Sequence, residues 1–250
     1  MTSRHEIESY LNSTLEIGRF RDYGPNGLQV EGRDEIRKLV SGVTASRAMI
    51  EAAIEHKADA LLVHHGLFWK NQDGRITGWL KQRIELLLAN GINLFAYHLP
   101  LDAHPEFGNN AQLGAKLKFS IDGRFGEQDL GFIGTAGQPL TAAALGALLT
   151  FRLGRTPVVV EGTPGRQFRK VAWCTGGAQG YFEAAIAAGA EAYITGEISE
   201  PQAHLARETG VTFIACGHHA SERYGAPAIA AHVAEKFGLE HQFIEIDNPA

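Results

Sequence analysis

The chain has 250 residues, and its 23 Lys and Arg residues against 28 Asp and Glu residues give a formal net charge of −5. Hydrophobic residues make up 44% of the chain, which is typical of a globular protein, and no apolar run approaches the roughly 20 residues of a membrane helix. The negative charge argues against nucleic-acid binding through phosphate contacts alone. The first residues lack the apolar core of a signal peptide, so we expect a cytoplasmic protein.

Short apolar runs at residues 39–43, 60–63 and 93–97 predict strands that are covered on both faces. Helical segments separate them, and Gly91 closes the second one in the position of a helix C-cap. Strands that alternate with helices indicate βαβ units and mostly parallel sheets.

An internal repeat extends this pattern to the second half of the chain. The segment that begins at Lys38 aligns with the one that begins at Lys170, an offset of 132, and residues 91–96 align with 210–215 at an offset of 119. We therefore predict two similar α/β lobes, residues 1–125 and 126–250. The segment 119–165, with one helical stretch at 140–153, is assigned to the start of the second lobe.

Helix signals recur in the second copy. Ser199 is placed to cap a helix with Gln202 as its capping-box partner and Pro201 in the first turn, and Gly189 occupies a C-cap position.

Six of the eleven histidines fall in three segments that each follow a predicted strand, at residues 63–66, 97–104 and 217–222. Ligands of open α/β sheets bind beyond the carboxyl ends of the strands, so the three segments are expected to converge. His64 and His65 would point to opposite faces of a regular strand. At a strand end, where the backbone turns at Gly66, each can instead bind a different metal ion. His218 and Glu222 are four residues apart and share a face if they lie on a helix.

The imidazoles and carboxylates of these segments are ligands for zinc, iron, manganese, nickel or cobalt. Five donors exceed what one tetrahedral ion requires, so we predict two metal ions bridged by a carboxylate and a hydroxide. Such a site is positively charged and favours a small anionic substrate, and it can activate water. The five predicted ligands are His64, His65, Asp102, His218 and Glu222.

Other histidines admit simpler roles. His98 is either a ligand or a partner that orients one. His104 and His219 are expected not to be ligands, with His219 near the substrate. A structural role is assumed for the remaining five, His5, His56, His204, His232 and His241.

The glycine loop at residues 175–180 lies between a strand and a helix, where backbone N–H groups can hold phosphate. Its spacing is not that of a dinucleotide-binding loop, and close packing of strand against helix is the favoured reason for its glycines.

The chain resembles the GTP cyclohydrolase 1 type 2 homologue family, also called NIF-three-like, in its short bacterial form without an inserted domain. The resemblance spans nearly the whole chain and is carried, in order, by residues 24–30, 63–69, 97–102, 108–110, 195–197 and 217–223. It implies the NIF-three-like fold, with a dinuclear metal site of the five residues named above in the cleft between the lobes. It also implies a ring-shaped homohexamer, and hydrolysis of GTP with loss of formate from C8. Glu197 aligns with the His64–His65 strand end of the first copy, and both a functional and a structural role stay open for it.

Three functions follow from these features. The first is a metal-dependent hydrolase of GTP or another anionic compound, in which His98 orients a ligand or carries a proton. The second is a non-catalytic metal-binding protein for storage, delivery or regulation. The third, a ring around DNA, is disfavoured by the net charge.

Overall fold

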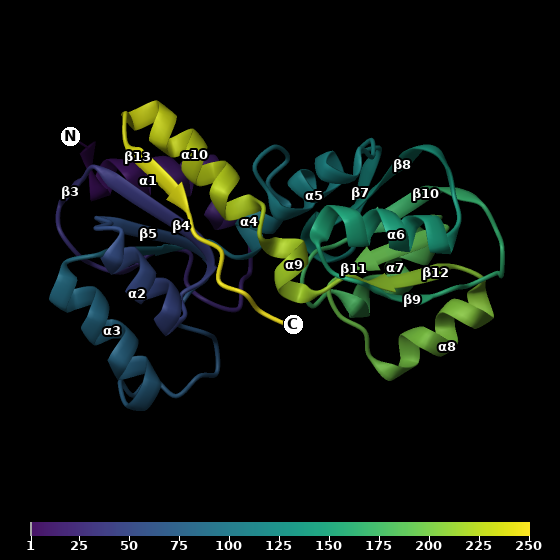
Figure 1. The fold of residues 1–250 in the computed structure, drawn as a ribbon, viewed down its shortest axis with the longest axis horizontal. Helices are drawn as coiled ribbons and strands as arrows, with labels where there is room; N and C mark the ends of the chain where they lie inside the picture. Colours follow the sequence, from purple (N-terminus) through teal and green to yellow (C-terminus); the bar gives the residue numbers. More distant parts are fainter. Residues whose placement is uncertain (1) are drawn as a thin grey trace. The chain divides into compact units, whose positions relative to one another are not determined.

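The computed structural model describes residues 2–250, which form two compact α/β units (Figure 1). Unit 1 contains the chain up to Leu101 together with Gly225–Asp247, and unit 2 contains Asp102–Tyr224 and Asn248–Ala250. The division does not coincide with the boundary near residue 125 that the repeat suggested. A C-terminal helix and strand return to unit 1, and alignment of two repeat copies gives no sign of such a return. Across residues 2–250, every helix is too short or too polar to span a bilayer.

The sheet of unit 1 has parallel strands at its centre, as the repeat predicted. The order is β13 (Glu240–Phe243), β4 (Lys38–Thr44), β5 (Ala60–His65), β6 (Asn93–Ala96) and β2 (Gly27–Val30). Strands β13, β4, β5 and β6 run parallel, and β2 closes the edge antiparallel to β6. A separate antiparallel pair joins β1 (Thr2–Ser3) to β3 (Glu35–Ile36).

Helices cover both faces of this sheet (Figure 1). Side chains alternate along a strand, so Val40, Leu61 and Leu94 share one face, where they form a buried cluster with Met49 and Leu87. That cluster draws on α2 (Arg47–Glu55) and α3 (Gly78–Asn90), whereas α1 (Arg4–Thr14) and α10 (Gly225–Phe237) pack on the opposite face. A 3₁₀ turn, η1 (Ile17–Arg19), follows α1, and α4 (Leu99–Ala103) carries the chain out of unit 1.

Unit 2 repeats the parallel core but surrounds it with antiparallel strands. The order is β7 (Gly123–Phe125), β8 (Gly131–Leu140), β10 (Phe168–Trp173), β11 (Ala192–Thr195), β12 (Thr212–Ala215) and β9 (Val158–Val160). Only β10, β11 and β12 are parallel among the described strands of this unit. β7 and β8 are joined by a short turn, which permits antiparallel pairing without a crossover helix.

The helices of unit 2 lie on two faces of its sheet. Trp173 and Phe132 pack with residues of α5 (Asn109–Leu117) and α6 (Ala142–Leu153) on one face. The opposite face carries an aromatic cluster, in which Phe182 stacks on Tyr193 and Phe213 meets both rings edge-on, with ring centroids 4.9–5.8 Å apart. The remaining elements are α7 (Phe182–Ala187), α8 (Glu200–Thr209), α9 (His218–Glu222) and the 3₁₀ turns η2 (Glu127–Asp129) and η3 (Gln179–Tyr181).

Predicted helix ends are confirmed. Ser199 and Gln202 form the capping box of α8, where the Ser199 N–H donates to Gln202 Oε1 at 3.1 Å. Gly91 closes α3 with a positive φ of 61°, and Gly189 follows α7 with a φ of 83°.

A matching acidic residue begins the second strand of each repeat copy. Asp59 Oδ2 accepts the two successive backbone N–H groups at the start of β4, at 2.9 and 3.0 Å. Glu191 Oε2, its equivalent at an offset of 132, accepts two backbone N–H groups in β10 at 3.0 and 3.1 Å. The repeated acidic position therefore joins adjacent strands in both units.

The repeat reaches further upstream than the aligned segments. A Cβ on Gly32, after β2, would lie 2.5 Å from Gly91 O, and one on Gly162, after β9, would lie 2.4 Å from Gly210 O. Both glycines thus permit the same close approach to a helix C-terminus, and β9 is the counterpart of β2.

Replacement of Glu191 with Gln tests this carboxylate through its pH dependence. Burial raises the pKa of Glu191, but the backbone N–H groups of Lys170 and Arg169 and the charge of Arg166 outweigh it, so the pKa falls below 4.5. A lowered pKa stabilises the fold above pH 4.5, and this contribution disappears as the pH falls through the pKa of the folded state. We expect Glu191→Gln to lower the melting temperature at pH 7 and the difference from wild type to shrink below pH 4.5. A difference that is unchanged at pH 3, or equal to that of the exposed control Glu208→Gln, would contradict this account.

Candidate metal centre

Strand β5 of unit 1 ends in the two histidines that the sequence singled out. His64 is fully buried and its Nδ1 donates to the Tyr97 carbonyl at 3.0 Å, whereas His65 Nδ1 lies 3.1 Å from Thr44 Oγ1. Although β5 continues through His65, the two ring centroids are only 4.5 Å apart. With Nδ1 engaged in both rings, Nε2 is the nitrogen through which each can bind a metal.

The turn after β5 depends on Gln29 of β2. Gln29 Oε1 accepts the Leu67 N–H at 2.8 Å, and a Cβ on Gly66 would lie 2.2 Å from that same oxygen. The absence of a side chain at Gly66 therefore lets Gln29 hold the backbone directly behind the two histidines.

His98 belongs to the same cluster and is held by a residue that sequence reasoning missed. His98 Nδ1 lies 2.6 Å from Asp22 Oδ1, and Asp22 Oδ2 accepts the Leu99 N–H at 2.9 Å. Ligand atoms of His64, His65 and His98 lie within 4.8 Å of one another, so this group can hold a metal ion. Asp22 stands in a polar stretch without a recognisable motif, and only the fold brings it to His98.

The Asp22 carboxylate is almost fully enclosed, with 4% of its side chain exposed. Burial raises its pKa, but the hydrogen bond and charge of His98 and the Asn26 amide outweigh burial, and the pKa is lowered. Asn26 Oδ1 in turn accepts the His98 N–H at 2.7 Å.

Asp22→Ala is expected to destabilise the protein by about 1–3 kcal/mol, because buried donors of His98 and Leu99 lose their acceptor. Urea unfolding measures this loss. Asp73→Ala, which breaks an exposed pair with Arg75, should change the free energy of unfolding by less than about 0.5 kcal/mol. Equal losses in the two variants would show that the hydrogen bonds of Asp22 contribute no more to stability than those of an exposed carboxylate.

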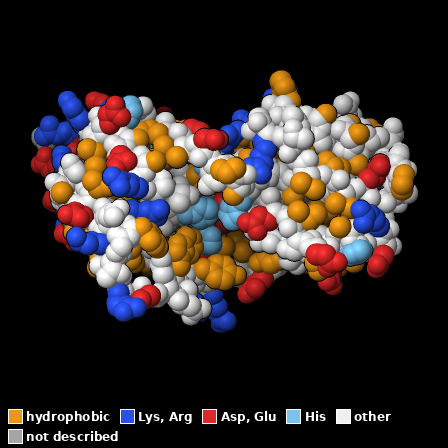
Figure 2. Space-filling view, turned by 60° about the horizontal axis from the view of Figure 1, so that its bottom comes forward, with side chains coloured by type: hydrophobic (Ala, Val, Ile, Leu, Met, Phe, Trp, Pro, Cys, Tyr) orange, Lys and Arg blue, Asp and Glu red, His pale blue; other side chains and the backbone are white. Residues whose placement is uncertain are grey.

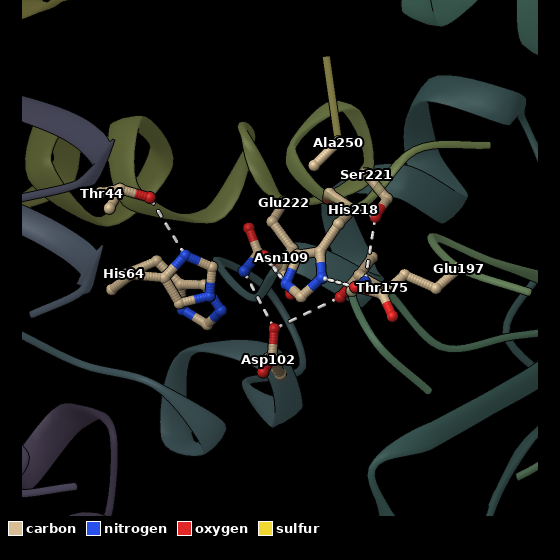
Figure 3. Close-up of polar contacts among 12 residues, drawn as sticks. Thr44, His64, Asp102, Asn109, Thr175, Glu197, His218, Ser221, Glu222 and Ala250 are labelled. Carbon is tan, nitrogen blue, oxygen red and sulfur yellow. Dashed lines mark hydrogen bonds and ion pairs between the residues drawn. The ribbon is translucent and has the colours of Figure 1, made fainter. Parts of the chain in front are cut away.

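Unit 2 carries the predicted carboxylates. Asp102 is 7% exposed, and its Oδ1 accepts from Asn109 Nδ2 at 2.9 Å and from Thr175 Oγ1 at 3.3 Å (Figure 3). Asn110 Nδ2 donates to the Asp102 carbonyl, and Asn110 Oδ1 accepts the Thr175 N–H. Asn109 and Asn110, which lie in one of the segments that carry the family resemblance, thus support Asp102 from the start of α5.

His218 and Glu222 lie one turn apart on α9, which confirms the shared helix face. His218 Nε2 is 3.1 Å from Glu222 Oε2, and its Nδ1 is 2.6 Å from Glu197 Oε1 (Figure 3). Burial lowers the pKa of His218, but the hydrogen bonds and charges of Glu222 and Glu197 outweigh burial and raise the pKa to about 9.

The buried carboxylates of Asp102 and Glu222 both influence the pKa of Cys174. Burial raises the pKa of the Cys174 thiol well above its ordinary value, and the negative charges of Asp102 and Glu222 raise it further. Carboxylates and imidazoles are ligand types that divalent transition metals accept.

Gly176 contributes neither phosphate binding nor packing between its own strand and helix as its main role, but space for side chains of α9. A Cβ at this position would lie 1.9 Å from Glu222 Oε1 and 3.2 Å from His218 Nε2, and its φ is +71°. Its N–H donates to Ser221 Oγ at 3.0 Å. The glycine therefore makes room for the functional groups of α9, and packing between strand and helix is not its main purpose.

Three other histidines have structural contacts. His104 Nδ1 accepts backbone N–H groups of its own loop, and His232 and His241 bond to Tyr10 and Ser41. His219 is 8% exposed and its N–H donates to the Ala250 carbonyl at 3.3 Å, so it is a buried residue of α9.

Comparisons with known proteins agree with this architecture. A family model described as DUF34/NIF3 (NGG1p interacting factor 3) matches residues 2–249. A Neisseria meningitidis serogroup A protein named GTP cyclohydrolase 1 type 2 homolog is 55% identical over 250 residues and is covered completely, as is this chain. The solved structure of the protein ybgI, described as of unknown function, has a TM-score of 0.96 at 44% identity and full coverage of both chains. A solved protein structure from Thermus thermophilus has a TM-score of 0.89 at 34% identity, again with full coverage of both.

Proposed function

Because the chain belongs to the DUF34/NIF3 family, we propose that it is a metal-dependent hydrolase that acts on GTP or a related anionic compound. The supporting observation is the pattern of support behind the donors. Each predicted ligand imidazole is held through Nδ1, and the Asp102 carboxylate is fixed by an amide and a hydroxyl. Preorganised donors of this kind are characteristic of metal sites.

The proposed ligands would hold two divalent transition-metal ions per chain, of zinc, iron, manganese or nickel. His64, His65 and His218 would supply imidazole nitrogens, and Asp102 and Glu222 would supply carboxylate oxygens. When bound, such ions stabilise negative charge and lower the pKa of water. The proposed ligands are His64, His65, Asp102, His218 and Glu222.

The substrate class follows from charge and from the relatives. Two divalent ions with two carboxylates leave an excess of positive charge, which favours a nucleotide phosphate. The relatives named GTP cyclohydrolase 1 type 2 homolog point to GTP, from which hydrolysis at C8 would release formate. His98 is proposed to carry a proton or to orient a ligand. Asp22 holds its Nδ1, so Nε2 is the nitrogen that would transfer the proton.

The partners proposed are the small anionic substrate and further copies of the chain in a homohexamer, as the resemblance implies. Nucleic acid is not among them. On the face drawn in Figure 2, Lys and Arg side chains alternate with Asp and Glu among the described residues, without an extended basic surface.

Metal content tests the site. We expect about two equivalents of a transition metal per chain in protein purified without chelators or a histidine tag. His65→Ala and Asp102→Asn should each bind fewer than two, whereas His204→Ala, on the surface of α8, should bind as wild type. Elemental analysis after reconstitution with zinc, manganese and iron measures the metal content. One equivalent or none in the wild type would contradict the proposal of a dinuclear site.

Formate release from GTP tests the activity. The metal-loaded protein should release formate, and His65→Ala should lose more in rate than the roughly 10- to 100-fold that loss of a partner behind a ligand typically costs. GTP left intact by a fully loaded protein would exclude the cyclohydrolase reaction and favour the non-catalytic metal-binding function.

A further inference from the structure

We propose that Glu197 is a positioning residue, which holds the His218 imidazole through Nδ1 so that Nε2 is presented to metal. This inference rests on the proposed metal site and assigns a role to a residue outside its ligand set. The key contact is the 2.6 Å distance between Glu197 Oε1 and His218 Nδ1, on the ring edge opposite Nε2 (Figure 3).

The loop that carries Glu197 is built for close approach to His218. A Cβ on Gly196 would lie 2.6 Å from both His218 Cα and the Gly176 carbonyl oxygen. The Gly196 carbonyl accepts the Gly217 N–H at 3.0 Å, and Thr195 Oγ1 donates to the Gly176 carbonyl at 3.1 Å. Only glycine fits at position 196, and its absence of a side chain lets the next residue reach the imidazole.

The carboxylate of Glu197 is itself held in place. Gln179 Nε2 donates to Glu197 Oε2 at 3.3 Å, and Gln202 Nε2 bonds to the Gln179 carbonyl at 3.3 Å. Gln202 belongs to the capping box of α8, so the start of that helix and the glycine loop converge on the same carboxylate.

The repeat explains why a carboxylate stands here. At the offset of 132, Glu197 is the counterpart of His65, which is a donor in unit 1. The second copy retains the strand end at β11 but places there a group that contacts a ligand from behind.

The chemistry suits this role. A metal that binds His218 would take the place of the Nε2 proton, while Nδ1 keeps its proton and donates it to the Glu197 carboxylate, which increases the basicity of Nε2. Glu197 is 45% exposed, so as a surface ion pair alone it would contribute little to folding. A positioning role and a structural role therefore predict different measurements.

The test compares Glu197→Ala and Glu197→Gln with wild type in the full chain. Zinc dissociation constants are measured by competition with a chelator, and the Co²⁺-substituted proteins are compared by visible absorption. We expect Glu197→Ala to bind zinc about 10- to 100-fold more weakly, with an altered Co²⁺ spectrum and an unchanged melting temperature of the metal-free protein. Glu197→Gln, which retains an oxygen acceptor of the same reach, should lose less.

The matched control is Glu200→Gln, since Glu200 also bonds to a histidine of the same unit, with Glu200 Oε1 2.9 Å from His204 Nε2. It should leave zinc affinity unchanged. Wild-type zinc affinity and spectrum in both Glu197 variants, with metal bound normally by the wild type, would overturn the Glu197 assignment alone. A wild type that binds no metal would overturn the proposed function and this inference together.

Discussion

The candidate site depends on one recurring contact, an oxygen atom that engages the Nδ1 of a histidine. The oxygens belong to the Tyr97 carbonyl, the Thr44 hydroxyl and the carboxylates of Asp22 and Glu197. An imidazole can rotate and change tautomer, and a contact at Nδ1 restricts both, so that Nε2 is presented in a defined direction. This arrangement reduces the conformational freedom of each ring.

Glycines form the second requirement. Gly66, Gly176 and Gly196 each occupy a position where a Cβ would collide with Gln29, Glu222 or the backbone of His218. All three follow strands of a parallel core, where the chain leaves the sheet and polar groups need close access to the backbone. The same strand-end geometry thus serves both units, although the groups that it presents differ.

The two copies present different residues at these strand ends. The acidic residues at positions 59 and 191 keep the same contact with the neighbouring strand, because the sheet of each unit needs it. The end of the following strand carries His65 in the first copy and Glu197 in the second, so a proposed metal ligand in one copy corresponds to the residue proposed to position a ligand in the other. An α/β repeat can keep its sheet while the residues at the strand ends change, because those residues contribute little to the hydrophobic core.

Much of the architecture could be predicted because it depends on local pattern. The apolar runs that became β4, β5 and β6, the capping box of Ser199 and the four-residue spacing of His218 and Glu222 are all decided by short-range periodicity. Residue types also restricted the chemistry, since histidines and carboxylates at strand ends favour transition metals.

Tertiary structure alone decided the rest. The return of α10 and β13 to unit 1, the clamp of Asp22 on His98 and the space that Gly176 leaves for Glu222 join residues 46 to 202 positions apart. Such contacts leave no periodic trace, because they require a particular side chain at one point in space rather than a repeated pattern along the chain. The sequence by itself determined which groups are available and on which elements they lie, and the packing of those elements decided which atoms meet.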